Sequence, residues 1–254
     1  MVHIDKYIKY FDPGQVLMIT ARAGCGKTTL GMQLINGLVN SFQSKGLFTS
    51  LEMPNHDIFA RCAIIEKNKD RANPLTTECV FDELMKDEII KKQTIEQWKN
   101  LLIIDRDSLT LEQIENYFQL ANDKCGHKIE ALMIDYGGLI RGSDNYEGIS
   151  KIARGIKSLA KRLHTRIIIV VQLSRAAKDG KIRVTMDMLR DTGAWEESAD
   201  YILGCWLSPS DPKRIHSSVL KNRYGDRDID FDIINQGLFY YTEDFKPETQ
   251  SYGF

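Results

Sequence analysis

The sequence predicts one α/β domain: a mostly parallel central sheet with helices on both faces and antiparallel strands at its C-terminal edge. Short apolar runs alternate with longer runs of helical period along most of the chain, which is typical of β-α-β units. Two of the runs, ALMIDY and RIIIVVQ, are apolar through their centres, as strands buried on both faces are. The chain has 254 residues, 43% of them hydrophobic, so it can bury a sizeable core within one domain of this class.

The parallel part of the sheet is predicted from the first apolar runs. These strands are expected at residues 15–20, 47–51, 101–105, 131–136, 166–172 and 201–206. Helices are expected between them at residues 27–42, 55–66, 111–122 and 149–163. The polar and charged stretch from Lys67 to Lys99 is interpreted as surface helices and loops, not as a linker between domains.

The pattern changes after Trp206. Three strand-like runs follow, at residues 215–220, 229–234 and 238–241, and the turn signals YGD and NQG separate them. These runs are expected to add antiparallel strands to one edge of the sheet. We therefore expect a single domain over residues 1–245 and a disordered tail over residues 246–254.

The near balance of charge excludes several classes of protein. The chain has 34 Lys and Arg against 35 Asp and Glu, so it is not a general nucleic-acid coating protein, and any contact with DNA must be confined to a local patch. No uncharged apolar run approaches the length of a membrane span, and the N-terminus lacks a signal-peptide pattern, so a cytoplasmic protein without membrane contact is expected. The five cysteines never form a CxxC pair, which argues against a disulfide framework or a zinc site.

The segment from Ala21 to Thr28, ARAGCGKT, lies between the strand QVLMIT and a helical run. This is the setting of a P-loop, in which backbone N–H groups and a helix N-terminus hold the phosphates of a nucleotide. Lys27 is expected to reach the β- and γ-phosphates, and the Thr28 hydroxyl to bind Mg²⁺. Ala21 replaces the first glycine of the strict pattern, and an ordinary glycine-containing turn is the alternative interpretation. The residues expected to bind the nucleotide are Ala23, Gly24, Cys25, Gly26, Lys27, Thr28 and Thr29.

Carboxylates at strand ends are the next candidates. The metal of a P-loop site needs an acidic partner on a neighbouring strand, and Asp135 supplies one at the end of ALMID. Asp105, at the end of LLIID, has the same setting, so the pattern alone does not choose between the two. Hydrolysis also needs a group that orients or deprotonates water. Glu52, which ends the strand after the P-loop helix, is the candidate, with a plain surface carboxylate as the alternative.

The motifs occur in a recognisable order. ARAGCGKTT is followed by SLEMPNHDIFARCA, ALMIDYGGLI, EGISKIARGIKSLAKRL with VVQLSR, MLRDTGAWEESADYIL and VLKNRYG. Together they resemble the C-terminal motor domain of DnaB-type replicative DNA helicases, which are RecA-like P-loop NTPases that form rings and translocate on single-stranded DNA. The resemblance runs from about Ile4 to about Tyr240, and it is specific because six separate motifs occur in order.

The resemblance implies roles for several residues. Glu52 matches the catalytic glutamate, and Asp135 matches the metal-binding aspartate, which leaves the other strand-end aspartate without that role. Gln172 matches the residue that senses the γ-phosphate. Lys221 and Arg223 match the pair that reaches the nucleotide of the neighbouring subunit, where a guanidinium can stabilise charge in the transition state.

The DNA contacts are expected in the loop after the fifth strand. Residues 174–190 contain five basic and two acidic residues, a local charge of +3, and a solvated surface loop is the alternative interpretation. The resemblance adds Arg190, Asp191 and Gly193 as contacts to the sugar-phosphate backbone, and implies that residues 137–148 face the same channel. The expected DNA-binding residues are Arg175, Lys178, Lys181, Arg183, Arg190, Asp191 and Gly193.

The leading hypothesis is an ATP-dependent DNA helicase motor that uses ATP and Mg²⁺. Its expected partners are single-stranded DNA, further copies of the chain in a hexameric ring, and a primase or helicase loader. The P-loop begins close to the N-terminus, so the family's N-terminal domain and linker helix are expected to be absent. We expect a truncated form or a minimal motor of phage or prophage kind, in a bacterial or host cytoplasm.

Two other functions are open at this point. One is a regulatory or adaptor ATPase that binds a helicase or recombinase partner without unwinding DNA itself. The other is a filament-forming recombinase, which the SLEM and KNRYG motifs and the lack of an N-terminal polymerisation segment disfavour.

Overall fold

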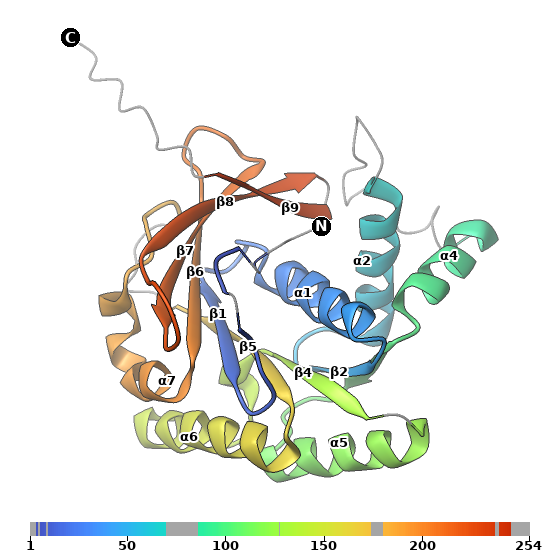
Figure 1. Cartoon of the computed structure of the whole chain (residues 1–254), viewed down its shortest axis with the longest axis horizontal. Helices are drawn as coiled ribbons and strands as arrows, with labels where there is room; N and C mark the ends of the chain where they lie inside the picture. Colours follow the sequence, from blue (N-terminus) through green and yellow to red (C-terminus); the bar gives the residue numbers. More distant parts are fainter. Residues whose placement is uncertain are drawn as a thin grey trace.

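The described residues form one nine-stranded sheet in the order β3-β2-β4-β5-β1-β6-β7-β8-β9 (Figure 1). The computed structural model describes residues 4, 6–8, 10–69, 86–126, 128–173, 180–236 and 239–244. The first six strands pair in parallel, and β6 to β9 pair antiparallel, which confirms the predicted fold class. The strands are β1 Val16–Ala21, β2 Lys45–Ser50, β3 Leu101–Asp105, β4 Ile129–Asp135, β5 Arg166–Gln172, β6 Tyr201–Leu207, β7 Arg214–Asn222, β8 Ile229–Gln236 and β9 Phe239–Asp244.

Local signals explain where the helices begin. Thr110 and Gln113 form a capping box at the start of α5, and the Asn145 side chain accepts a hydrogen bond from the backbone of α6. Helix α1 has no side-chain cap, because its N-cap residue, Gly26, has no side chain, and its first N–H groups are therefore open to a ligand. The helices are α1 Lys27–Ser41, α2 Asn55–Asn68, α4 Glu88–Trp98, α5 Leu111–Cys125, α6 Tyr146–Leu163, α7 Gly193–Ser198, and the 3-10 helices η1 Gly137–Leu139 and η2 Met186–Thr192.

The helices of the described residues lack the combination of length and apolar composition that crossing a bilayer requires.

Some segments depart from the sequence-based expectation. The basic loop expected over residues 174–190 gives way to helix earlier than predicted, because η2 begins at Met186 and α7 follows it directly. Leu189 and Trp195 are buried here, and their apolar contacts explain the helical conformation. The stretch expected as a loop over residues 137–148 contains η1 and the first turn of α6. The expected tail over residues 246–254 lies outside the described residues.

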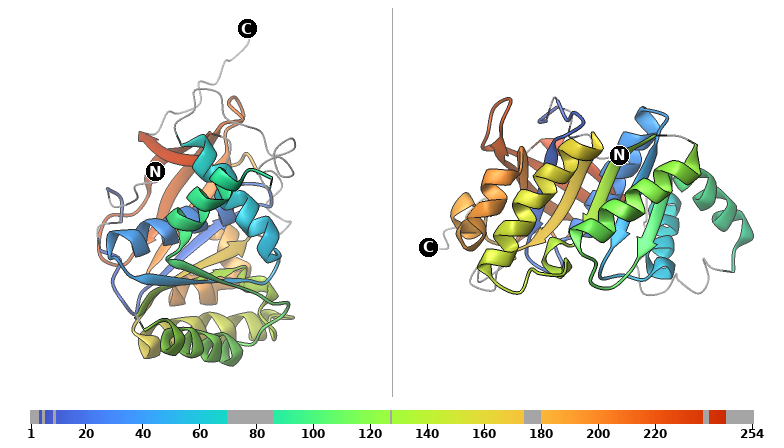
Figure 2. Two further views of the ribbon diagram at one scale, coloured as in Figure 1. Left: turned by 90° about the vertical axis from the view of Figure 1, so that its right-hand side faces the viewer. Right: turned by 90° about the horizontal axis from the view of Figure 1, so that it is seen from below.

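Helices cover both faces of the sheet. α1, α2 and α4 lie on one face, and α5, α6 and α7 lie on the other (Figures 1 and 2). Successive residues of β1 separate accordingly: Leu17 and Ile19 belong to the apolar cluster under α1, whereas Val16 and Met18 belong to the cluster under α6. Because the parallel strands all point the same way, the residues that follow them meet where these strands end. This is called the C-terminal edge of the sheet, and the side where the parallel strands begin is the N-terminal edge.

Asp200, just before β6, joins three elements at the N-terminal edge of the sheet, where the parallel strands begin. Its side chain is fully buried, and one carboxylate oxygen accepts hydrogen bonds from Val16 N–H at 2.8 Å and from Lys157 Nζ at 2.6 Å. Arg223 Nε lies 3.3 Å from the other oxygen, an ion pair without hydrogen-bond geometry. This carboxylate connects β1, α6 and the turn after β7.

We expect Asp200→Ala to lower the free energy of unfolding by about 3–5 kcal/mol, because it leaves the largely buried ammonium of Lys157 without its anionic partner. Urea unfolding followed by circular dichroism measures this. The matched control is Lys6→Ala, which removes an exposed ion pair with Asp244 and should leave the midpoint unchanged. Equal midpoints for Asp200→Ala and the wild type would contradict the role given to this carboxylate.

Candidate functional site

The residues that the sequence singled out for nucleotide binding meet at the C-terminal edge of the parallel strands. A cavity of about 370 Å³ lies between the turn after β1 and the ends of β2, β4 and β5. Its volume is in the range of ligand sites in proteins. The structure thus brings side chains from four strand ends around one space. The predicted site residues that line it are Ala23, Gly24, Gly26, Lys27, Thr28, Thr29, Glu52, Asp135 and Gln172.

The P-loop turns tightly because two of its glycines adopt left-handed backbone conformations. The φ angle is +79° at Gly24 and +73° at Gly26, a region that favours glycine. Lys27 Nζ donates a hydrogen bond to Arg22 O at 2.8 Å, and burial lowers the pKa of Lys27. A phosphate in the cavity would favour the charged form of Lys27, so the site is electrostatically suited to an anion.

Cys25 is the predicted P-loop residue that does not line the cavity. Its side chain is buried, its Sγ lies 3.9 Å from Gly180 O, and burial raises the pKa of the thiol. The thiol packs into the protein as a small apolar group. Cys25 can therefore contribute to nucleotide binding only through its backbone.

Thr28 and Asp135 form the candidate metal centre. Asp135 is 1% exposed, and its Oδ2 has no hydrogen-bond partner among the described residues. Burial raises the pKa of Asp135, and a hydrogen bond from the Thr28 hydroxyl lowers it. An unpartnered buried carboxylate oxygen beside a hydroxyl fits Mg²⁺, a hard cation that prefers oxygen ligands. The described part of the chain contains no cluster of three His, Cys, Asp or Glu that could hold a metal. Mg²⁺ in proteins is usually bound through one or two carboxylates together with waters and substrate phosphates.

Asp105 has a structural role instead. β3 lies at the edge of the sheet, and the Asp105 carboxylate accepts a hydrogen bond at 2.7 Å from the N–H of Asn55, the first residue of α2. A carboxylate at a helix N-terminus is stabilised by the N–H groups there. Asp105 does not line the nucleotide cavity. The structure therefore separates two aspartates that look alike in the sequence.

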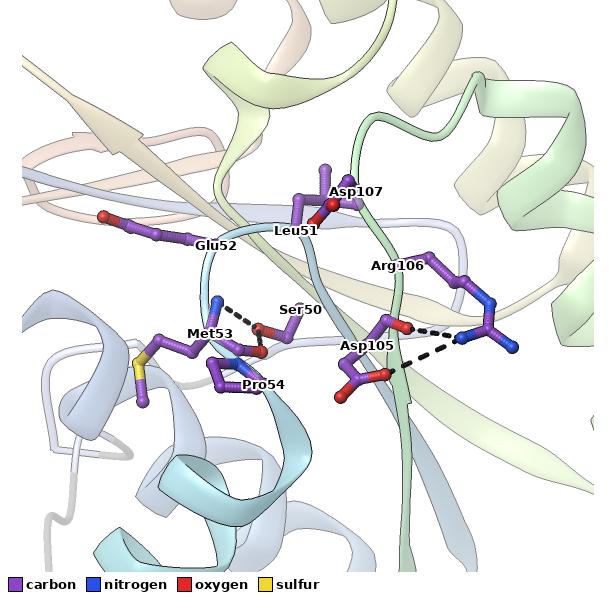
Figure 3. Close-up of a pocket in the computed structure, with 8 residues that line it drawn as sticks. All are labelled: Ser50, Leu51, Glu52, Met53, Pro54, Asp105, Arg106 and Asp107. Atoms are coloured by element: carbon purple, nitrogen blue, oxygen red, sulfur yellow. Dashed lines mark hydrogen bonds and ion pairs between the residues drawn. The ribbon is translucent and has the colours of Figure 1, made fainter.

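Glu52 stands between the nucleotide cavity and a second cavity of about 300 Å³. The turn that carries Glu52 is held by the Ser50 hydroxyl, which donates to Met53 O at 2.7 Å and accepts from Met53 N–H at 3.1 Å. The second cavity lies between this turn and the residues that end and follow β3. Figure 3 shows the Glu52 side chain extended away from Asp105 and Arg106. A fixed turn thus positions its carboxylate, which has no ion pair within the described residues.

Six residues that sequence reasoning missed also line the cavity. Three of them are polar side chains from more distant elements: Arg61 from α2, Asn235 from β8 and Tyr240 from β9. The others are Met53, Tyr136 and Val170. Arg61 Nη1 donates a hydrogen bond to Thr29 Oγ1 at 3.2 Å. The signal for Arg61 was its place in the SLEMPNHDIFARCA motif, on the helix that follows Glu52. Asn235 and Tyr240 had no local signal, because an antiparallel hairpin far along the chain brings them to the site.

Lys221 and Arg223 lie at the N-terminal edge of the sheet, away from the nucleotide cavity. β7 runs antiparallel to β6, and Lys221 pairs with Ile202 near the start of β6. Lys221 Nζ donates a hydrogen bond to Ala199 O at 2.7 Å, and Arg223 Nη2 donates one to Glu197 O at 3.2 Å. Neither residue lines the nucleotide cavity of its own chain. A pair that acts on the nucleotide of a neighbouring subunit needs such a position.

The expected DNA-contact segment is described only in part. Arg175 and Lys178 lie outside the described residues. The backbone of Arg190 and Asp191 belongs to η2, whereas their side chains are outside the description. Gly193 is the first residue of α7. The contacts expected from the end of a loop would therefore come from a helical segment.

Lys181 and Arg183 lie near the C-terminal end of β6, since Leu207 N–H donates a hydrogen bond to Gly180 O at 2.8 Å. This is the edge of the sheet that carries the P-loop. Lys181 is exposed. Arg183 is engaged within the chain, because its Nη2 lies 2.8 Å from a carboxylate oxygen of Asp230. Arg183 can reach a DNA phosphate only by leaving or sharing this partner.

One family of known proteins matches most of the chain. Residues 1–229 match the family described as the DnaB-like helicase C terminal domain. The replicative DNA helicase DnaB of Mycoplasma genitalium is 31% identical over 229 residues, which cover 83% of this chain and 46% of the relative. DnaB of Helicobacter pylori is 31% identical over 209 residues, which cover 80% of this chain and 42% of the relative. The chain thus spans less than half of these relatives' length.

Solved structures show the same fold. One of them, an ATPase domain, superposes with a TM-score of 0.78 at 20% identity, covering 94% of this chain and 88% of that one. A DnaB-like replicative helicase, solved in a study of its interactions with primase, superposes with a TM-score of 0.76 at 19% identity, covering 91% of this chain and 58% of that one.

The raised pKa of Asp135 predicts how stability depends on pH. The folded protein binds this proton more tightly than the unfolded chain does, so stability falls as pH rises from the ordinary carboxyl value through the raised one. Above that range, without Mg²⁺, the cost of burying the carboxylate charge lowers the stability of the fold. We expect Asp135→Asn to raise Tm at pH 7 and to lose the stabilisation by MgADP.

Thermal unfolding in EDTA, with and without added MgADP, measures both effects. The gain in Tm from Asp135→Asn should shrink as the pH is lowered, which serves as an internal control. Identical Tm values for variant and wild type at pH 7 would contradict the role of this carboxyl group.

Proposed function

Because the chain belongs to the family of DnaB-like helicase C-terminal domains, we propose that it is an ATP-dependent DNA helicase motor that couples hydrolysis to translocation on single-stranded DNA in replication. One observation carries this proposal: Lys27, Thr28, Glu52, Asp135 and Gln172 come from separate segments and line one cavity. Binding alone would be served by the P-loop. A strand-end glutamate and glutamine at the same space favour hydrolysis.

In the proposed reaction, the P-loop N–H groups and Lys27 hold the phosphates, and Thr28 with Asp135 holds Mg²⁺. When bound, Mg²⁺ neutralises charge on the phosphate oxygens. Glu52 accepts a proton from the attacking water, and Gln172 contacts the γ-phosphoryl group. Gln172 ends β5 and directly precedes the predicted DNA-contact segment. A change at the γ-phosphate can therefore be passed to that segment through the backbone.

Lys221 and Arg223 complete the proposed mechanism between subunits. They lie at the edge of the sheet away from the chain's own cavity, which supports action on a neighbouring subunit in a hexameric ring. The proposed partners are single-stranded DNA and either a primase or a helicase loader. The proposed location is the cytoplasm of a bacterium, or of the host if the protein is encoded by a phage.

The decisive experiment measures the rate of ATP hydrolysis against protein concentration, with and without single-stranded DNA. The specific rate should rise with protein concentration, because each site needs the cationic finger, Lys221 and Arg223, of a neighbouring subunit. Single-stranded DNA should increase the rate further. A rate that depends on neither protein concentration nor single-stranded DNA would reject the helicase motor and favour an adaptor ATPase.

Lys27→Ala should reduce kcat for ATP at least about a hundredfold, because it removes a positioned charge from the transferring phosphoryl group. Steady-state phosphate release measures the rate. Circular dichroism and Tm without nucleotide should match the wild type, since Lys27 has no acidic partner within the described residues that the change would leave unpaired. A variant with wild-type turnover would refute the phosphate-binding role.

Arg223→Ala should lose hydrolysis at least about a hundredfold and keep the wild-type Kd for MgADP, because the guanidinium acts on the neighbouring site. Mixing this variant with Lys27→Ala provides a sharper test. In mixed assemblies the intact cavity of one variant faces the intact finger of the other, so part of the activity should return. No recovery on mixing, or loss of nucleotide affinity in Arg223→Ala, would reject the assignment in trans.

A further inference from the structure

The last described strand returns to the nucleotide cavity. β9 lies beside α1 and α2 (Figure 1), and Tyr240 N–H donates a hydrogen bond at 3.1 Å to the buried Gln33 Oε1 of α1. The Tyr240 side chain is 2% exposed and lines the cavity. Its neighbour Tyr241 is only half-buried, because successive strand residues point to opposite faces. The hairpin of β8 and β9 therefore builds Tyr240 into the wall of the site.

Tyr240 packs directly on the P-loop at Gly26. A Cβ atom on Gly26 would collide with Tyr240 Oη and would lie only 3.0 Å from Cζ. Glycine is required here for two reasons: its left-handed φ of +73° and the close approach of the tyrosine hydroxyl. The N–H groups that follow Gly26 open α1 and are the ones aimed at the phosphates.

The Tyr240 hydroxyl also belongs to a hydrogen-bonded chain across the site. It is hydrogen-bonded to Thr29, and Thr29 Oγ1 accepts a hydrogen bond from Arg61 Nη1 at 3.2 Å. Thr29 lies in the first turn of α1, and Arg61 lies on α2, the helix that follows Glu52. Three elements are thus linked behind the phosphate site: β9, α1 and α2.

We propose that Tyr240 is a positioning residue of the nucleotide site, which holds Gly26 and Thr29, and with them the first turn of α1, in the arrangement that binds phosphate. The inference rests on the nucleotide-binding part of the proposed function and goes beyond it, because it makes phosphate affinity depend on the C-terminal hairpin. N–H groups bind an anion well only when they converge on it, so a small displacement of this turn weakens binding. Tyr240 acts through the P-loop and not through the base of the nucleotide.

The test is Tyr240→Phe, which keeps the ring and removes only the hydroxyl. In the full chain, the Kd for MgADP and the Kd for magnesium pyrophosphate should both rise about threefold to tenfold, the range expected for one lost hydrogen bond. Isothermal titration calorimetry measures both. The matched control is Tyr241→Phe, on the other face of the same strand, which should bind both ligands as the wild type does. The Tm without ligand is measured for each variant, so that a general loss of stability is recognised.

A second pair of variants tests the path through Thr29. If Tyr240 and Thr29 act through their shared hydrogen bond, Tyr240→Phe combined with Thr29→Val should weaken binding no more than the stronger single change. Thr29→Ser, which keeps a hydroxyl, should restore the affinity that Thr29→Val loses. If the double variant raises Kd by the product of the two single effects, the proposal is overturned. A Kd for Tyr240→Phe within about twofold of the wild type would also overturn it. Weakened binding of MgADP with unchanged binding of pyrophosphate would also overturn it, because that result indicates contact with the nucleoside.

This outcome is separable from that of the motor function. A wild-type chain that binds MgADP but shows no hydrolysis dependent on single-stranded DNA would reject the motor and leave the role of Tyr240 intact. Conversely, if the wild-type chain shows hydrolysis dependent on single-stranded DNA and Tyr240→Phe binds MgADP as the wild type does, the motor stands and the role of Tyr240 is rejected.

Discussion

Burial of β1 on both faces is the constraint on which the rest of the structure depends. All six residues of β1 are buried, and β5 and β6 pair with it in parallel on either side. Helices must therefore cover both faces of the sheet, and the connections from the parallel strands must leave from one edge. The P-loop and Glu52 follow such strands, and Asp135 and Gln172 end them. Topology thus places them around one cavity although they are far apart in the chain.

The cavity carries charges that a magnesium-bound nucleotide would complement. Burial lowers the pKa of Lys27 and raises that of Asp135, so desolvation disfavours the charged form of each group. A phosphate beside Lys27 and a divalent cation beside Asp135 would favour those charged forms. The groups whose burial weakens the fold without ligand are therefore the ones proposed to bind it, which is a common compromise between stability and function.

The candidate functional groups lie at both ends of the parallel strands. The nucleotide cavity lies at the C-terminal edge, and Lys221 and Arg223 lie at the N-terminal edge, beside the buried carboxylate of Asp200. The proposed function needs head-to-tail contacts between subunits, which bring Lys221 and Arg223 of one subunit to the cavity of the next and close into a ring when the rotation between subunits permits it. The antiparallel strands extend the sheet beyond the finger and bring Tyr240 back to the P-loop.

The sequence by itself determined the order of the strands and of the helices α1, α2, α5 and α6, the position of the P-loop and, through family resemblance, the candidate roles of Glu52 and Asp135. Periodicity and local motifs report on the burial and turns of one segment at a time, and these features are local. The resemblance favoured Asp135 over Asp105, but only the tertiary structure gave the physical difference between them, because LLIID and ALMID look alike until β3 is placed at the edge of the sheet. It likewise placed Tyr240 on the P-loop, since the register and curl of a distant antiparallel hairpin depend on how the whole sheet packs.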